Sequence, residues 1–87
     1  MATAHVVIFV TGWCQYCARA QSLLDQKGIT FEVIDVDAVP GARDEMVARG
    51  GGRTVPQIFI GEKHVGGCDD LLALDERGEL DRLIQGD

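Results

Sequence analysis

Apolar runs and helical patterns alternate along the first 37 residues, and this alternation predicts an α/β fold. Residues 5–10 (HVVIFV) are almost continuously apolar and rich in β-branched side chains, as in a central strand covered on both faces. Residues 15–27 have the spacing of an amphipathic helix, and Gly28 is suited to end it. A second apolar run, residues 29–37, predicts a strand parallel to the first, joined to it by a right-handed crossover. The apolar face of the helix carries Cys17, Ala20 and Leu24, with Leu23 at its edge.

The second half of the chain predicts one more helix, a β-hairpin and two further helices. Pro40 can open a helix over about residues 40–49, with Met46 and Val47 facing inward, and the GGGR of residues 50–53 breaks it. The remaining predicted elements are two strands around a Gly-Glu turn and two helices: residues 56–60, 63–66, 68–76 and 79–85. The order β-α-β-α-β-β-α-α fits a small mixed sheet of four strands with helices on both faces.

Composition and charge narrow the range of functions. The 87 residues suffice for one domain, residues 1–87, and 46% of them are hydrophobic. The formal net charge is −6 and the eight basic residues form no cluster, which argues against a nucleic-acid partner. The longest apolar run is far shorter than the roughly 20 residues that span a bilayer, and the first residues show no signal peptide. We therefore expect a cytoplasmic protein with no membrane partner, and three cysteines, an odd number, fit no secreted disulfide framework.

The two cysteines of CQYC, Cys14 and Cys17, stand where the first strand gives way to the first helix. Unpaired backbone N–H groups at a helix N-terminus stabilise a thiolate, so we expect Cys14 to be the exposed nucleophile. Cys17, one turn further along, is expected to be more buried and within disulfide-bonding reach of it. Two alternatives stay open: the cysteines only pack in the core, or they bind zinc together with His64 and Cys68. A redox pair fits this position best, because no second ligand pair with the spacing of a zinc knuckle is present.

Three motifs, WCQYC, RTVPQIFIG and VGGCDDLLALDERGEL, occur in this order and resemble those of the small dithiol glutaredoxins of bacteria. The resemblance extends from Val6 to Leu83. It implies a thioredoxin-like fold and a glutathione-dependent thiol–disulfide oxidoreductase that reduces glutathionylated and disulfide-bonded proteins. In such an enzyme Cys14 would attack the disulfide, Cys17 would resolve mixed disulfides with protein substrates, and glutathione would recycle the oxidised pair. We expect a monomer.

The resemblance also implies a glutathione site. Pro56 would follow a cis peptide bond and face the cysteines, and the backbone of Val55 would pair with the cysteinyl part of glutathione. Backbone N–H groups at the start of the third helix would hold the γ-glutamyl carboxylate of glutathione, and Asp69 would pair with the γ-glutamyl ammonium. Arg53 and Gln57 would bind the glycine carboxylate. The implied glutathione-binding residues are Tyr16, Arg53, Thr54, Val55, Pro56, Gln57, Gly67, Cys68 and Asp69. From the residues alone, Pro56 also fits the start of an edge strand, Asp69 a helix cap and Arg53 a solvated loop charge.

The chain departs from the family pattern at two positions. Thr11 stands where many glutaredoxins carry a lysine, so one positive charge near Cys14 is missing. Gln15 replaces the usual proline of CPYC, which restores a backbone N–H and gives the turn more freedom. Family members without this proline include dimers that hold a [2Fe–2S] cluster through the first cysteine of each chain and two glutathione thiolates. A cluster-carrying dimer that uses Cys14 is therefore the alternative function, with no metal expected in the apo form.

Overall fold

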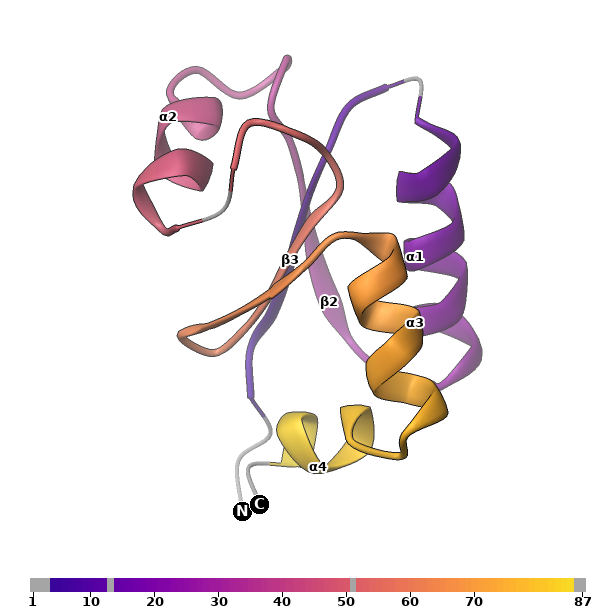
Figure 1. Ribbon diagram of the computed structural model, residues 1–87. Coiled ribbons are helices and arrows are strands. Elements are labelled where there is room, and N and C mark those ends of the chain that lie inside the picture. Colours follow the sequence, from indigo (N-terminus) through magenta and orange to yellow (C-terminus); the bar gives the residue numbers. More distant parts are fainter. Residues whose placement is uncertain (1–3, 13, 51, 86–87) are drawn as a thin grey trace.

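The computed structural model describes residues 4–12, 14–50 and 52–85, which form one four-stranded sheet and four helices. The elements follow the predicted order β-α-β-α-β-β-α-α (Figure 1). Their bounds are β1 (Val6–Val10), α1 (Gln15–Gln26), β2 (Phe31–Asp35), α2 (Ala42–Ala48), β3 (Gln57–Ile60), β4 (Lys63–Gly66), α3 (Cys68–Glu76) and α4 (Leu80–Gln85).

β1 lies inside the sheet, whose strand order is β2-β1-β3-β4. It runs parallel to β2, with Ile8 opposite Val33, and antiparallel to β3, with Ile8 opposite Ile58. β4 returns antiparallel to β3. This mixed sheet with helices on both faces is the thioredoxin-like arrangement, so the predicted fold class is confirmed.

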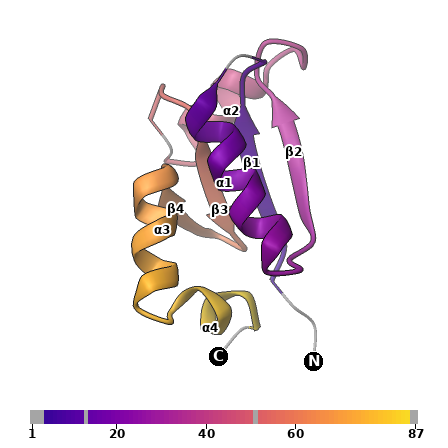
Figure 2. The same cartoon turned by 90° about the vertical axis from the view of Figure 1, so that its right-hand side faces the viewer.

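Helices cover both faces of the sheet: α1 and α3 lie side by side on one face, and α2 lies on the other (Figure 1, Figure 2). Because side chains alternate along a strand, β1 contributes to two cores. Val6, Ile8 and Val10 pack under α1 and α3, whereas Val7 and Phe9 pack toward α2. All five residues of β1 are buried, as predicted for a strand covered on both faces. Within the described residues, no helix is long and apolar enough to cross a membrane.

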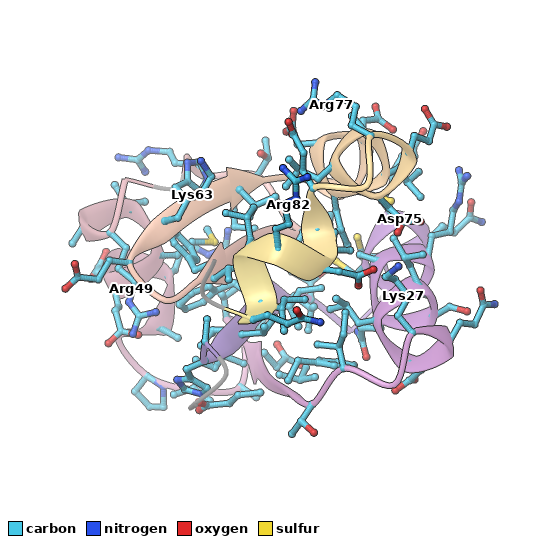
Figure 3. The ribbon with its side chains drawn as sticks, turned by 90° about the horizontal axis from the view of Figure 1, so that it is seen from below. Lys27, Arg49, Lys63, Asp75, Arg77 and Arg82 are labelled. Atoms are coloured by element: carbon cyan, nitrogen blue, oxygen red, sulfur yellow. The ribbon has the colours of Figure 1, made fainter. Side chains whose placement is uncertain are left out.

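The end of α1 is tied to the last two helices. The helix ends at Gln26, and Gly28 then adopts a left-handed conformation with φ of 71°, as its sequence position predicts. The ammonium of Lys27 lies 2.7 Å from the carboxylate of Asp75 in α3 (Figure 3). It also lies 3.4 Å from the carboxylate of Asp81 in α4. These three charges hold the C-terminal end of α1 against α3 and α4.

The second helix and the second strand differ in part from the prediction. α2 begins two residues later than predicted, because Gly41 has a φ of 80°, outside the helical range. Met46 is buried as predicted, but the prediction for Val47 is wrong, since this side chain is 39% exposed. Neighbouring side chains on a helix point about 100° apart, so a short helix on a sheet buries only one stripe. β2 is shorter than predicted at both ends and forms an edge of the sheet.

Candidate active site

Cys14 lies between the end of β1 and the start of α1, at the position that caps the helix. Its backbone is extended, with φ of −140° and ψ of 109°, while its carbonyl already accepts a hydrogen bond from Ala18 N–H at 3.1 Å. The sulfur of Cys14 accepts a hydrogen bond from Cys17 N–H, also at 3.1 Å. Because the first N–H groups of a helix attract negative charge, this position suits a nucleophilic sulfur.

Cys17, one helical turn further along, is almost fully buried, with 1% of its surface exposed. It packs in the core under α1 and α3. Burial, together with the neighbouring Cys14 side chain, raises the pKa of Cys17 to about 12, so its thiol is protonated near neutral pH. The two thiols are therefore unequal, and Cys17 is the more buried of the pair, as the sequence predicts.

The loop before β3 faces the cysteines. The Val55–Pro56 peptide bond is cis, as the resemblance implies. The carbonyl oxygen of Val55 lies 3.9 Å from the sulfur of Cys14. At this distance, a group bonded to the Cys14 sulfur would lie beside the backbone of Val55.

A pocket of about 190 Å³ opens next to this loop, between the first turn of α1 and the N-terminus of α3. Its lining residues are Tyr16, Thr54, Val55, Pro56, Gly67, Cys68, Asp69 and Asp70. The first seven belong to the nine glutathione-binding residues implied by the resemblance, so the fold brings most of that set together. The first N–H groups of α3 have no acceptor within the helix, and this end of the pocket therefore suits an anion. Burial raises the pKa of the Cys68 thiol, which makes it a poor nucleophile near neutral pH.

Asp70 is the pocket residue that sequence reasoning missed. Its carboxylate accepts a hydrogen bond from Gly67 N–H at 3.0 Å, which fastens the first turn of α3 to the turn before it. Gly66, with φ of 118°, leaves space for this carboxylate, because a Cβ atom at Gly66 would collide with it. An acidic residue three positions after a helix cap is part of the capping-box pattern, so the sequence does carry a signal for this role.

Two residues of the implied glutathione set do not line the pocket. Gln57 is only 6% exposed, and strand alternation turns it toward the α2 side of the sheet together with Phe59. There its Nε2 donates to the hydroxyl of Thr54 at 3.2 Å, and its Oε1 lies 2.6 Å from Nε2 of His64. Arg53 lies in the exposed loop before these residues.

The zinc alternative has no support in the structure. Within residues 4–12, 14–50 and 52–85, no three His, Cys, Asp or Glu side chains are grouped so that they could hold a metal ion. His64, one of the four residues considered for zinc, bonds to Gln57 and stacks on Phe59 with ring centroids 5.0 Å apart. Its ring is therefore engaged on the α2 side of the sheet.

Both departures from the family pattern lie next to the thiols. Thr11 is half-buried and shares a surface hollow with Cys14 and Cys17. Gln15 is the first residue of α1, and its side chain is exposed. Neither residue brings a positive charge to the thiol pair.

The unequal thiol pair and the sheet order together place the protein among the dithiol proteins of thioredoxin-like fold. The family model of glutaredoxins matches residues 6–65. A glutaredoxin of Pseudomonas aeruginosa is 54% identical over 79 residues, which cover 91% of this chain and 94% of that protein. Glutaredoxin 3 of Escherichia coli K12 is 50% identical over 82 residues, covering 94% and 99% of the two chains. The crystal structure of a buckwheat glutaredoxin–glutathione complex superimposes with a TM-score of 0.86 at 32% identity, covering 95% of this chain and 78% of that one. The chain therefore belongs to the glutaredoxin family, whose members are thiol oxidoreductases.

Proposed function

We propose that the protein is a glutathione-dependent thiol–disulfide oxidoreductase that reduces glutathionylated and disulfide-bonded proteins. The observation that carries the proposal is the inequality of the two thiols. Cys14 is partly exposed at the N-terminus of α1, whereas Cys17 is buried behind it. A sulfur needs an open path to attack a disulfide, so Cys14 is the attacking thiol.

With a glutathionylated protein, the Cys14 thiolate attacks the glutathionyl sulfur. The disulfide of the substrate breaks, the substrate leaves as its thiolate, and Cys14 becomes bonded to glutathione. A second glutathione thiolate then attacks the glutathione sulfur of this bond. Oxidised glutathione leaves and the Cys14 thiolate returns, so this cycle does not need Cys17.

With a protein disulfide, Cys14 forms a mixed disulfide and Cys17 resolves it. Besides burial, interactions with Cys14 raise the pKa of the Cys17 thiol. When Cys14 becomes part of a neutral disulfide, its charge is gone, and the pKa of Cys17 falls at the step that needs its thiolate. Cys17 then attacks the Cys14 sulfur, the substrate leaves with two reduced thiols, and two glutathione molecules reduce the Cys14–Cys17 disulfide.

The pocket beside Val55 supports glutathione as the reductant. A glutathione sulfur bonded to Cys14 would lie near Val55, whose backbone can pair with the cysteinyl residue like an added strand. The N-terminus of α3 suits the γ-glutamyl carboxylate, and the exposed Asp69 suits the neighbouring ammonium. The similar buckwheat protein is described as a glutaredoxin–glutathione complex, which favours the same ligand here.

Two serine substitutions test this mechanism. We expect Cys14→Ser to abolish all turnover. We expect Cys17→Ser to keep the reduction of a glutathionylated peptide and to lose the reduction of a protein disulfide. Oxidised glutathione formed in each reaction can be followed through glutathione reductase and the consumption of NADPH. A Cys14→Ser protein that still turned over would end the proposal.

The [2Fe–2S] alternative stays a prediction. A cluster shared by two chains would use the same accessible sulfur, that of Cys14, from each chain together with two glutathione thiolates. The feature that favours it is Gln15 in place of the usual proline. We further propose that the apo protein is a monomer and acts in the cytoplasm, where a reduced glutathione pool can recycle the thiols.

A further inference from the structure

The outer edge of β2 has no partner strand among the residues that the structure describes. Val36 N–H donates to the carbonyl of Val10 at 2.9 Å, and backbone groups alternate in direction along a strand. The N–H and C=O of Val33 therefore point away from β1, toward the outer edge. Proteins commonly block such an edge with lysine, proline or a bulge, but β2 has the sequence FEVID. This edge can accept a strand from another chain.

A hollow of about 330 Å³, here called the β2 groove, lies between this edge and the start of α2. Its lining includes Glu32, Val33, Ile34, Val39, Pro40 and Glu45. The Val39 side chain is 47% exposed in the groove. The Val33 side chain is 46% exposed as well, but Val33 lies opposite Ile8 and therefore points to the α1 side of the sheet. The charged residues of this lining are Glu32 and Glu45, and both are acidic. The β2 groove is therefore an apolar surface with negative charge beside it.

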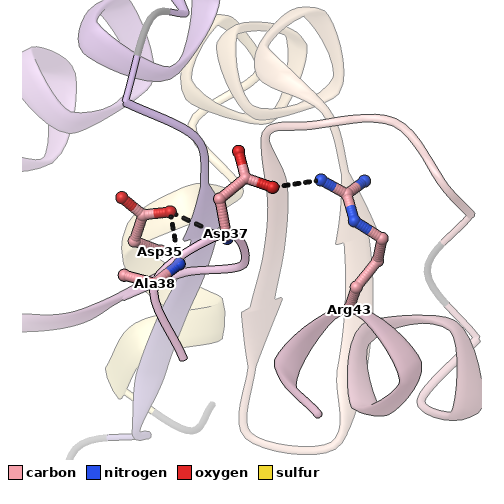
Figure 4. A network of polar contacts seen from close by, with 4 residues as sticks. All are labelled: Asp35, Asp37, Ala38 and Arg43. Atoms are coloured by element: carbon pink, nitrogen blue, oxygen red, sulfur yellow. Dashed lines mark hydrogen bonds and ion pairs between the residues drawn. The ribbon is translucent and has the colours of Figure 1, made fainter. Parts of the chain in front are cut away.

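Hydrogen bonds hold the loop that forms the far wall of the β2 groove. One carboxylate oxygen of Asp35 accepts from Asp37 N–H at 2.9 Å and from Ala38 N–H at 3.3 Å. The guanidinium of Arg43 lies 2.9 Å from the carboxylate of Asp37 (Figure 4). Val39 N–H donates to the carbonyl of Asp35 at 3.0 Å. The loop thus presents Val39 in a defined position, and a ligand would not need to order it first.

We propose that the β2 groove binds an extended, basic segment of a partner protein, which adds to β2 as a further strand. The outward N–H and C=O of Val33 would pair with the backbone of this segment. Apolar side chains of the segment would contact Val33 on the α1 side of the sheet, and the side chains that alternate with them would face the groove. Its lysine or arginine side chains would lie next to Glu32 and Glu45.

The charges beside the groove select the kind of occupant. Glu32 lies 3.2 Å from His5 and Glu45 lies 3.7 Å from Arg49, but all four side chains are exposed. Such exposed pairs are weak, so both carboxylates can exchange these partners for a basic ligand. A second copy of the chain fits less well, because its own β2 edge is acidic and each copy carries a net charge of −6.

The β2 groove lies at the same end of the sheet as Cys14. β1 and β2 are parallel, so the C-terminal end of β2 lies at the same edge of the sheet as the end of β1 that leads to Cys14. A partner protein docked on β2 would be held near Cys14. This use rests on the proposed oxidoreductase function, whereas the binding itself does not.

Amide chemical shifts of the ¹⁵N-labelled protein, titrated with an octapeptide of alternating lysine and valine, test the binding. We expect saturable shifts at Val33, Val39 and their neighbours. The matched octapeptide of alternating glutamate and valine should leave these amides unchanged. Shifts confined to other parts of the chain, or equal binding of the two peptides, would overturn the proposal.

Three variants separate strand addition from attraction between charges. Val33→Pro removes the outward N–H but leaves the pairing with β1, and losing one such bond should weaken binding about five-fold. Glu45→Lys should weaken binding as well, while Glu76→Lys, with the same change of charge on α3, should not. Equal affinity for Val33→Pro and the unmodified protein would contradict strand addition. If Val33→Pro does not fold, the comparison of Glu45→Lys with Glu76→Lys decides, and equal affinities of these two would refute the site.

Discussion

Replacing Cys17 with serine tests whether the folded protein raises the pKa of the buried Cys17 thiol. Burial and the neighbouring Cys14 raise the pKa of Cys17 from its ordinary value of 9.0 to about 12 in the folded protein. Between these values the unfolded chain loses a proton that the folded chain keeps, so rising pH favours unfolding. The stabilisation is complete below about pH 9 and is lost progressively as the pH approaches 12. The free energy of unfolding therefore falls by about 1.4 kcal/mol per pH unit in this window because of Cys17 alone.

The measurement is urea-induced unfolding, followed by circular dichroism at several pH values with all thiols kept reduced. Serine does not ionise, so its burial costs a constant amount and only the slope with pH matters. The stability of the unmodified protein relative to Cys17→Ser should fall by about 2 kcal/mol between about pH 8 and 10.5. Ser22→Ala, an exposed substitution on the same helix, should show a difference that does not vary with pH. If the difference in unfolding free energy between the unmodified protein and Cys17→Ser did not change with pH, the raised pKa of Cys17 would be refuted. The thiol would then ionise equally in the folded and the unfolded protein.

Three further predictions concern α3, the helix junction and the thiol site. Asp70→Ala removes the acceptor that fastens the first turn of α3, so the KM for glutathione should rise about five-fold with a smaller change in kcat, and Asp70→Asn should recover part of the loss. Steady-state kinetics measure this split, and an unchanged KM would show that Asp70 does not position the pocket. Lys27→Gln should lower the thermal unfolding midpoint by removing the contacts with Asp75 and Asp81, and the loss should shrink at high salt. A salt-independent loss would assign the effect to packing of the Lys27 side chain. Anaerobic reconstitution with iron, sulfide and glutathione should give visible absorption that Cys14→Ser lacks if the protein carries a cluster; a colourless product would remove the cluster alternative.

The core could be predicted because its signals are local. Five apolar residues in succession cannot be half exposed in a strand, so β1 had to lie inside the sheet. Val47 could not be placed in the same way. Its exposure depends on where α2 begins, which Gly41 determines, and on how much of the sheet this short helix covers. Burial on a short helix depends on tertiary contacts that the apolar pattern does not contain.

The role of a site residue could be predicted where it depends on neighbours in the chain, and not where it depends on partners from distant segments. The burial order of Cys14 and Cys17 follows from their positions at a helix start, and the structure agrees. Gln57 follows Pro56 in the chain, but it does not line the pocket. Strand alternation turns its side chain to the α2 side of the sheet, where it bonds to His64 of β4. Asp70 stands three positions after the helix cap, as in a capping box, but the sequence does not show that its carboxylate bonds to Gly67 N–H at the wall of the pocket.

Mass spectrometry of the Cys17→Ser variant, after reaction with a glutathionylated peptide, tests the proposed mechanism most directly. Without the resolving thiol, the intermediate should accumulate as one glutathione bonded to Cys14, and added glutathione should release it. Peptide mapping locates the bond. Glutathione attached to Cys68 instead, or no adduct at all while the peptide is still reduced, would contradict Cys14 as the attacking thiol.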